Sequence, residues 1–144
     1  MSAQRDRSSS ISEVLAGLAL FADLPGPQLQ AAAHTFEEEW FPEGRRVLRQ
    51  GLSGSNFFVI LDGQASVRVD GVDRATLGRG EFFGEVSVLL GEPPTADVVA
   101  TAPLRCAVLP GPQVRPFLTA FPEVLYRILQ AEARRLRDAL RWLS

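Results

Sequence analysis

A glycine followed by a glutamate, at the start of a short apolar run, is the feature of this sequence best suited to hold a ligand. Gly84 and Glu85 stand in the segment Gly80–Ala100, GEFFGEVSVLLGEPPTADVVA. Gly84 allows the tight backbone turn that begins a short helix over about Glu85–Leu90. Free N–H groups at a helix start attract an anion, and a buried carboxylate needs a hydrogen-bond donor. The segment therefore predicts a pocket for a small phosphorylated ligand.

The other chemically capable residues favour structural roles. His34 is the only histidine and has no second metal ligand in a recognisable spacing, so we expect it at the surface or at a helix cap. Cys106 lies in an apolar strand and is predicted to be buried, and Glu37–Glu39 to be a solvated strand edge. The sequence shows no paired base and nucleophile, no metal-ligand cluster and no glycine-rich loop followed by lysine. It thus predicts a binding or sensing module, not an enzyme, with no metal and no cofactor.

Composition sets the class of protein. The 144 residues suffice for one domain with its own core, and the net charge of −2 argues against a surface dedicated to nucleic acid. A single cysteine excludes an internal disulfide and favours a reducing compartment. The polar first residues are unlike a signal peptide, and no apolar run reaches the ~18 residues of a membrane span. We expect a cytoplasmic protein without membrane contact.

The elements that must position Gly84 and Glu85 are mostly short strands. Apolar spacing predicts a helix over Ile11–Phe21, and a second short helix is expected over Gln28–His34. Turn signals such as Asp62-Gly63 and Asp70-Gly71 then recur at even spacing, which is typical of a barrel or sandwich. We expect about eight strands, including residues 36–41, 47–50, 56–61, 64–70, 72–77, 97–101 and 104–109.

The last third of the chain is predicted to be helical. Gly111–Ala120 forms one short helix, and a long helix follows over Pro122–Leu143, begun by a proline that is favoured at a first helical position. The arginines of the long helix, Arg134, Arg135, Arg137 and Arg141, alternate with acidic residues, and we expect them on its solvated face. A leucine rhythm on this helix suits pairing with a second copy as a short coiled coil. The residues of that dimer stripe are Leu125, Leu129, Leu136, Ala139 and Leu143.

The segment Phe83–Ala96, FGEVSVLLGEPPTA, resembles the phosphate-binding cassette of cyclic nucleotide-binding domains. That family includes the sensor domains of CRP/FNR-type bacterial regulators, regulatory subunits of cyclic-nucleotide-dependent kinases and gated channels. The likeness extends over most of the chain, through residues 18–25, 41–44, 49–51 and 57–63. It implies a mainly β, α+β fold: an eight-stranded β-roll (a double-stranded β-helix or jelly roll) with N-terminal helices, a short cassette helix and a long C-terminal helix.

The resemblance also implies a ligand site. A cyclic nucleotide is the expected ligand, with Glu85 accepting a hydrogen bond from the ribose 2′-hydroxyl. Tyr126 or Trp142 is a candidate lid that could stack on the base. The candidate ligand-binding residues are Phe83, Gly84, Glu85, Val86, Ser87, Pro94, Thr95 and Ala96.

One position departs from the family pattern. The arginine that pairs with the cyclic phosphate is replaced by Pro94, and neither Arg74 nor Arg79 matches a family position. Losing such a charge-assisted contact should weaken phosphate binding by at least about tenfold. Thr95 and the N–H group of Ala96 remain as candidate phosphate contacts. The cassette is therefore degenerate, and the sequence predicts weak nucleotide binding or a non-standard ligand.

The expected organisation is a flexible N-terminus (1–10), a β-roll domain (11–121) and a C-terminal dimerisation helix (122–144). The favoured function is a regulatory sensor that acts as a homodimer. Two alternatives stay open: a ligand-free dimerisation or interaction module, and the sensor half of a CRP/FNR-type transcription regulator without its DNA-binding domain. The sequence itself shows no DNA-reading element.

Overall fold

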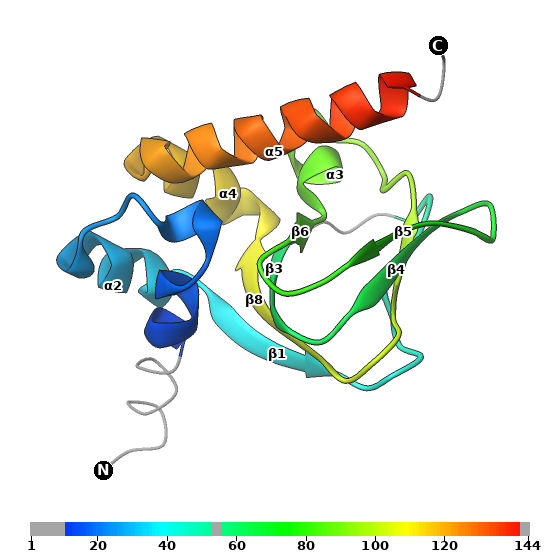
Figure 1. The fold of residues 1–144 in the computed structure, drawn as a ribbon, viewed down its shortest axis with the longest axis horizontal. Coiled ribbons are helices and arrows are strands. Elements are labelled where there is room, and N and C mark those ends of the chain that lie inside the picture. Colours follow the sequence, from blue (N-terminus) through cyan, green and yellow to red (C-terminus); the bar gives the residue numbers. More distant parts are fainter. Residues whose placement is uncertain (1–10, 53–55, 142–144) are drawn as a thin grey trace.

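The computed structural model describes residues 11–52 and 56–141, and the predicted flexible N-terminus lies outside them. Eight strands form two four-stranded antiparallel sheets, and helices cover one side of the roll (Figure 1). The first sheet has the order β1 (Glu37–Phe41), β8 (Leu104–Pro110), β3 (Asn56–Asp62), β6 (Phe82–Phe83). The second has the order β2 (Arg46–Leu48), β7 (Asp97–Ala100), β4 (Ala65–Val69), β5 (Val72–Leu77). The predicted β-roll is confirmed.

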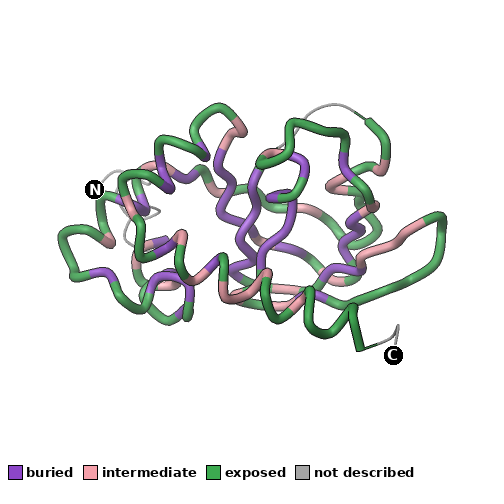
Figure 2. The backbone as a smooth tube through the Cα atoms, turned by 90° about the horizontal axis from the view of Figure 1, so that it is seen from above, coloured by how far each residue is buried: buried purple, intermediate pink, exposed green. Residues whose placement is uncertain are grey.

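Strand β3 links the two halves of the core. Its side chains alternate, as they must along a strand. Phe57, Val59 and Leu61 pack into a cluster shared with the helices, whereas Phe58 and Ile60 face a second cluster inside the roll. Figure 2 shows the buried backbone concentrated in these central strands, with exposed turns around them. The single cysteine, Cys106, is fully buried in the second cluster, as expected.

The helical segments differ from the prediction in detail. Residues 11–16 are helical, but the helix stops at Gly17 and a separate 3₁₀ turn, η1 (Ala19–Phe21), follows. Helix α2 (Gly26–His34) begins two residues earlier than predicted, directly after Pro25. The remaining helices are α3 (Glu85–Leu90), α4 (Gly111–Ala120) and α5 (Pro122–Arg141). Over the described residues, none of these helices is long and apolar enough to cross a membrane.

Of the two predicted hairpins, the one at Asp70-Gly71 is confirmed, whereas Asp62-Gly63 connects strands of different sheets, because β3 does not pair with β4. Asp70 and Gly71 have φ values of 53° and 80°, the left-handed pair that a tight two-residue hairpin requires. Gly63 has a φ of 96°, and a Cβ atom at this position would lie 2.2 Å from the carbonyl oxygen of Pro103. The turn residues therefore fix how strands β3, β4 and β5 follow one another.

Strand β1 lies at the edge of its sheet, where the glutamate run Glu37–Glu39 was expected to be solvated. Glu37 and Glu39 are exposed. Glu38 differs from the prediction, because its side chain is only 14% exposed and pairs with Arg105 on the neighbouring strand. Charge pairing across the two strands explains how this acidic residue is accommodated in a partly buried position.

Candidate functional site

A left-handed glycine joins strand β6 to helix α3. Gly84 has a φ of 88°, and a Cβ atom at this position would lie 2.2 Å from the carbonyl oxygen of Asn56. A side chain is therefore excluded both by the backbone conformation and by the close approach of β3. The helix ends at a second left-handed glycine, Gly91, whose N–H group donates to the carbonyl of Ser87. These two glycines keep α3 short and fix its first turn against the roll.

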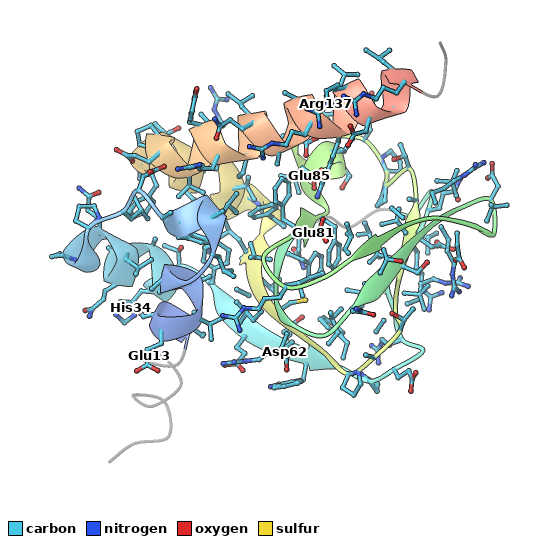
Figure 3. All side chains as sticks on the ribbon, viewed as in Figure 1. Glu13, His34, Asp62, Glu81, Glu85 and Arg137 are labelled. Atoms are coloured by element: carbon cyan, nitrogen blue, oxygen red, sulfur yellow. The ribbon has the colours of Figure 1, made fainter. Side chains whose placement is uncertain are left out.

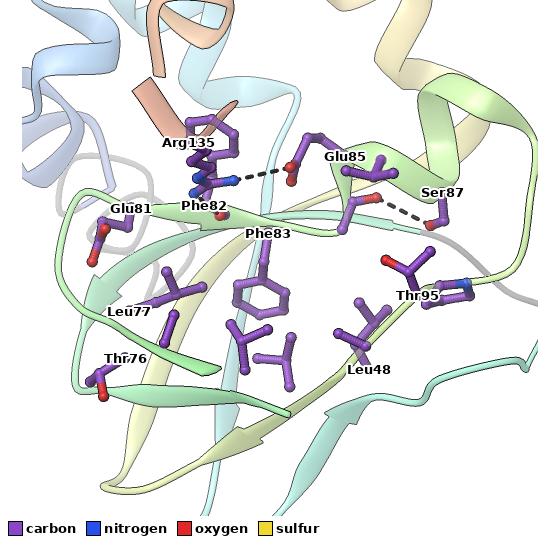
Figure 4. Close-up of a pocket in the computed structure, with 17 residues that line it drawn as sticks. Leu48, Thr76, Leu77, Glu81, Phe82, Phe83, Glu85, Ser87, Thr95 and Arg135 are labelled. Carbon is purple, nitrogen blue, oxygen red and sulfur yellow. Dashed lines mark hydrogen bonds and ion pairs between the residues drawn. The ribbon is translucent and has the colours of Figure 1, made fainter. Parts of the chain in front are cut away.

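The first turn of α3 borders a cavity of about 340 Å³ (Figure 4). All eight ligand-binding residues predicted from the sequence line this cavity. Chain folding brings residues 83–87 and residues 94–96 to the same opening, from the two ends of the cassette. The remaining wall comes from β2, β4, β5, β6, β7 and α5 and from Glu81 just before β6. Its residues are Leu48, Val67, Ala75, Thr76, Leu77, Glu81, Phe82, Val98 and Arg135.

The cavity combines an apolar wall with a few polar groups, which is the usual make-up of a small-molecule site. Leu48, Val67 and Val98 form part of its apolar side. The Ser87 hydroxyl is buried and donates to the carbonyl of Gly84, 3.3 Å away. Thr95 is exposed at the rim, so its hydroxyl is open to a ligand. Such a site can hold an apolar ring and offer hydrogen bonds to a polar edge.

Glu85 is the buried charged residue of the cavity. Its side chain is only 6% exposed, and its Oε1 atom accepts a hydrogen bond from Arg135 Nη1 at 3.0 Å. The other oxygen, Oε2, has no hydrogen-bond partner. Burial and the nearby carboxylate of Glu132 raise the pKa of Glu85 to about 7, against the opposing effect of Arg135. A ligand that brings a donor would satisfy the unpartnered oxygen.

Arg135 is the site residue that the sequence analysis missed. It was expected on the solvated face of the last helix, but Figure 4 shows its guanidinium between α5 and the cassette, pointing at Glu85. Arg135 Nη2 donates to the carbonyl of Phe82 at 2.7 Å, and its Cζ atom lies 4.3 Å from the centre of the Phe82 ring. A signal was present, because Val124, Ile128, Ala131 and Arg135 recur at helical spacing and share one face.

The phosphate position lacks a free cation. Pro94 is buried in the cavity wall, and its carbonyl accepts a hydrogen bond from the N–H group of Gly51 at 2.8 Å. Neither Arg74 nor Arg79 lines the cavity. Among the described lining residues Arg135 is the one cation, and it is already paired with acidic side chains. At the cassette, the described residues therefore offer a phosphate backbone N–H groups and the Thr95 hydroxyl.

The candidate lid and dimer residues lie elsewhere. Tyr126 is 61% exposed and absent from the cavity lining, because it faces away from Arg135 on α5, so it does not cover the cavity. Trp142 and Leu143 lie outside the described residues. Leu125 is half-buried and packs against the core, so it is a poor candidate for a dimer contact, whereas Ala139 is exposed. Leu129 and Leu136 are exposed, as a dimer stripe requires.

No described group of three His, Cys, Asp or Glu side chains is arranged to hold a metal ion. His34 is exposed at the end of α2, and Figure 3 shows it well away from Glu85. The chemistry of this arrangement is that of a binding site: one buried carboxylate, one guanidinium, the hydroxyls of Thr76, Ser87 and Thr95, and an apolar wall.

Comparison with known proteins identifies the same region. The model of the cyclic nucleotide-binding domain family matches residues 38–121, more than half of the chain. A cGMP-dependent protein kinase, egl-4 of Caenorhabditis briggsae, is 35% identical over 104 residues, which are 68% of this chain and 14% of the kinase. The chain therefore spans a small part of that relative.

Solved structures share the fold. The Thermus thermophilus catabolite activator protein has a TM-score of 0.77 and 29% identity, over 86% of this chain and 61% of that one. The regulatory subunit of a cAMP-independent protein kinase A from Trypanosoma brucei has a TM-score of 0.81 and 20% identity, over 100% of this chain and 52% of that one. A triple mutant of the Trypanosoma subunit, with one substitution introducing an arginine, is bound to cAMP in its A site (TM-score 0.75, 24% identity, over 97% of this chain and 54% of that one).

Proposed function

Because the chain belongs to the cyclic nucleotide-binding domain family, whose domains are regulatory and not catalytic, we propose that it is a ligand-sensing module that binds a nucleotide-type ligand in the cavity beside Glu85. The observation that carries this proposal is the cavity itself. The eight cassette residues line it together, and the buried carboxylate of Glu85 has one oxygen without a partner. A ribose hydroxyl is a donor of the kind that this oxygen lacks.

A cytoplasmic location is part of the same proposal, since the only cysteine is buried and unpaired.

The second part of the proposal concerns affinity. Pro94 removes both the guanidinium and a backbone N–H group from the phosphate position. Weak binding of cyclic phosphates, or preference for another ligand, follows from that loss. The Trypanosoma neighbour supports this reasoning, because its kinase is cAMP-independent and an arginine is one of three substitutions in the mutant subunit that is bound to cAMP.

The test is calorimetry of cAMP and cGMP with the wild-type chain and with Pro94→Arg. We expect weak binding to the wild type and an affinity at least about tenfold higher for the variant, because a charge-assisted phosphate contact is restored. The matched control is Pro93→Arg, since Pro93 is exposed and does not line the cavity. This control should leave the affinity unchanged.

Two results would contradict the proposal. Absence of heat at millimolar cAMP and cGMP for both the wild type and Pro94→Arg would exclude cyclic nucleotides from the cavity. An equal gain for Pro93→Arg and Pro94→Arg would show that the added charge acts from the surface and not from the phosphate position.

A second function, homodimerisation through α5, is favoured by a separate observation. Apolar residues on the outer face of α5 alternate in steps of three and four, which is the a/d pattern of a coiled coil. Four of them are more than half exposed. The stripe consists of Tyr126, Leu129, Ala133, Leu136 and Leu140. We propose that a second copy covers this outer stripe in a parallel dimer.

A further inference from the structure

The Arg135–Glu85 contact joins the last helix to the ligand cavity. Helix α5 crosses above α3, and the Arg135 side chain reaches from it to the cavity (Figures 1 and 4). Its Nη1 atom lies 3.0 Å from Glu85 Oε1 and 3.1 Å from Glu132 Oε1. Its Nη2 atom is held by the carbonyl of Phe82. One guanidinium is thus shared by two carboxylates and a backbone carbonyl.

We propose that Arg135 holds the Glu85 carboxylate through Oε1 in the absence of ligand, and that a ligand donor arriving at the unpartnered Oε2 weakens this hold. This inference rests on the proposed function, because it requires a ligand in the cavity. Ligand binding and the attachment of the second half of α5 then compete for one carboxylate. Arg135 thereby becomes a specificity-determining residue of the site, because only a ligand that brings a hydroxyl or amine donor can draw the Glu85 carboxylate away from it.

The burial of the two partners supports competition. Glu85 is almost fully buried, so losing its donor without replacement is costly. Arg135 is 37% exposed, and water can solvate its guanidinium when it leaves Glu85. Glu132 lies on the same helix as Arg135 and can still pair with its charge after Arg135 leaves Glu85. The buried Glu85 carboxylate therefore requires a hydrogen-bond donor. The Arg135 guanidinium is partly solvated and can lose its contact with Glu85 at a lower cost in free energy.

The second half of α5 depends on this contact more than the first half does. Val124 and Ile128 are buried, and the helix packs mainly against η1 and α4. After Ile128 no described residue of α5 is buried, and residues 136–141 are exposed. Figure 2 shows this exposed end of the helix. Four residues after Ile128 are half-buried: Gln130, Ala131, Glu132 and Arg135. Ala131 packs against the core cluster, and Arg135 contacts Glu85 of the cassette.

The first arm of the test uses no ligand. Amide hydrogen exchange over residues 134–141 is compared in the wild type, in Arg135→Gln and in Arg134→Gln. Arg134 is the matched control, because it lies on the same helix and is exposed. We expect exchange about fivefold faster in Arg135→Gln and unchanged in Arg134→Gln, since local opening becomes easier when the contact is lost. Equal exchange in all three proteins would overturn the proposal.

The second arm measures cAMP affinity by calorimetry in the Pro94→Arg background, with Arg135→Gln or Arg134→Gln added. Competition predicts that Arg135→Gln tightens cAMP binding by about threefold or more, and that Arg134→Gln has no effect. Weaker binding with Arg135→Gln would show that Arg135 contacts the ligand, and would overturn the proposal. Absence of cAMP binding to every variant would contradict the proposed function and the competition together. The first arm would still show whether Arg135 holds the helix.

Discussion

Glu85 is a carboxyl group whose surroundings favour its protonated form. Burial and the Glu132 carboxylate raise its pKa from 4.5 to about 7, so the folded chain binds this proton more tightly than the unfolded chain does. The resulting stabilisation is fully present below about pH 4.5 and is lost as the pH rises towards 7. Its upper limit is about 3 kcal/mol, at about 1.4 kcal/mol for each unit of pKa.

Glu85→Gln should remove this pH dependence. Urea denaturation at pH 5 and pH 7.5 is the measurement, and the free energy of unfolding of the wild type relative to the variant should fall by about 2 kcal/mol between them. Glu43→Gln, in an exposed turn, is the control and should follow the wild type. An identical pH profile for Glu85→Gln and the wild type would contradict the raised pKa.

Two separate constraints exclude a side chain at Gly84, and a matched pair of variants can distinguish them. Its φ of 88° disfavours any side chain, and a Cβ atom would also clash with the Asn56 carbonyl oxygen. Gly71 has a similar φ of 80°, but no atom lies within 4 Å of its Cβ position. We therefore expect Gly84→Ala to lower the free energy of unfolding by about 2 kcal/mol more than Gly71→Ala does. Equal losses in urea denaturation would contradict the close approach.

At the scale of elements, α5 has two apolar faces that a sequence alone does not separate. Leu125 was assigned to the dimer stripe, but it packs on the core, and Arg135 was assigned to solvent, but it lies at the cavity. Both errors arise because docking on η1 and α4 decides which face turns inward. The inner residues Val124, Ile128 and Arg135 and the outer leucines follow equally regular helical spacing.

The outer stripe of α5 supports a prediction about assembly. Leu136→Glu should convert the proposed dimer to a monomer, because a charge at an a/d position of a coiled coil is buried without a partner. Analytical ultracentrifugation of the wild type and the variant measures the change in mass. Arg134→Glu is the control, since Arg134 is exposed on the same helix and belongs neither to the predicted dimer residues nor to the outer stripe. A monomeric wild type at high micromolar concentration would contradict the dimer.

Local sequence signals predict some features of the strands and of the cavity but not others. The turn residues Asp70-Gly71 located the β4–β5 hairpin, because their left-handed backbone is a local property, whereas Asp62-Gly63 marks a turn between the two sheets. Strand β6 was not predicted as a strand, since two residues, Phe82 and Phe83, are too few to show an alternation. The cassette was found through its resemblance to a family, whereas the part of the cavity formed by β2, β4, β5 and α5 depends on chain contacts far apart in the sequence.

At the scale of the whole molecule, the roll and the helices place one cavity between the cassette and α5. Strand β3 connects the core cluster inside the roll with the cluster under the helices, and α3 begins where β6 leaves β3. A ligand bound at Glu85 would therefore contact both the roll and the helix whose outer face carries the proposed dimer stripe. This arrangement is suited to a sensor, because a change at one carboxylate can alter how the last helix is held.

The central claim is that the cavity beside Glu85 is where the ligand binds, and an NMR titration of the wild-type chain with cAMP tests it directly. The account predicts that the largest amide shift changes lie at residues 83–87 and 94–96, with smaller changes near Arg135 and none at the Gly71 turn. Even weak, fast-exchanging binding at millimolar cAMP would produce this pattern. Changes centred away from the cassette, or no changes at millimolar cAMP, would contradict the account.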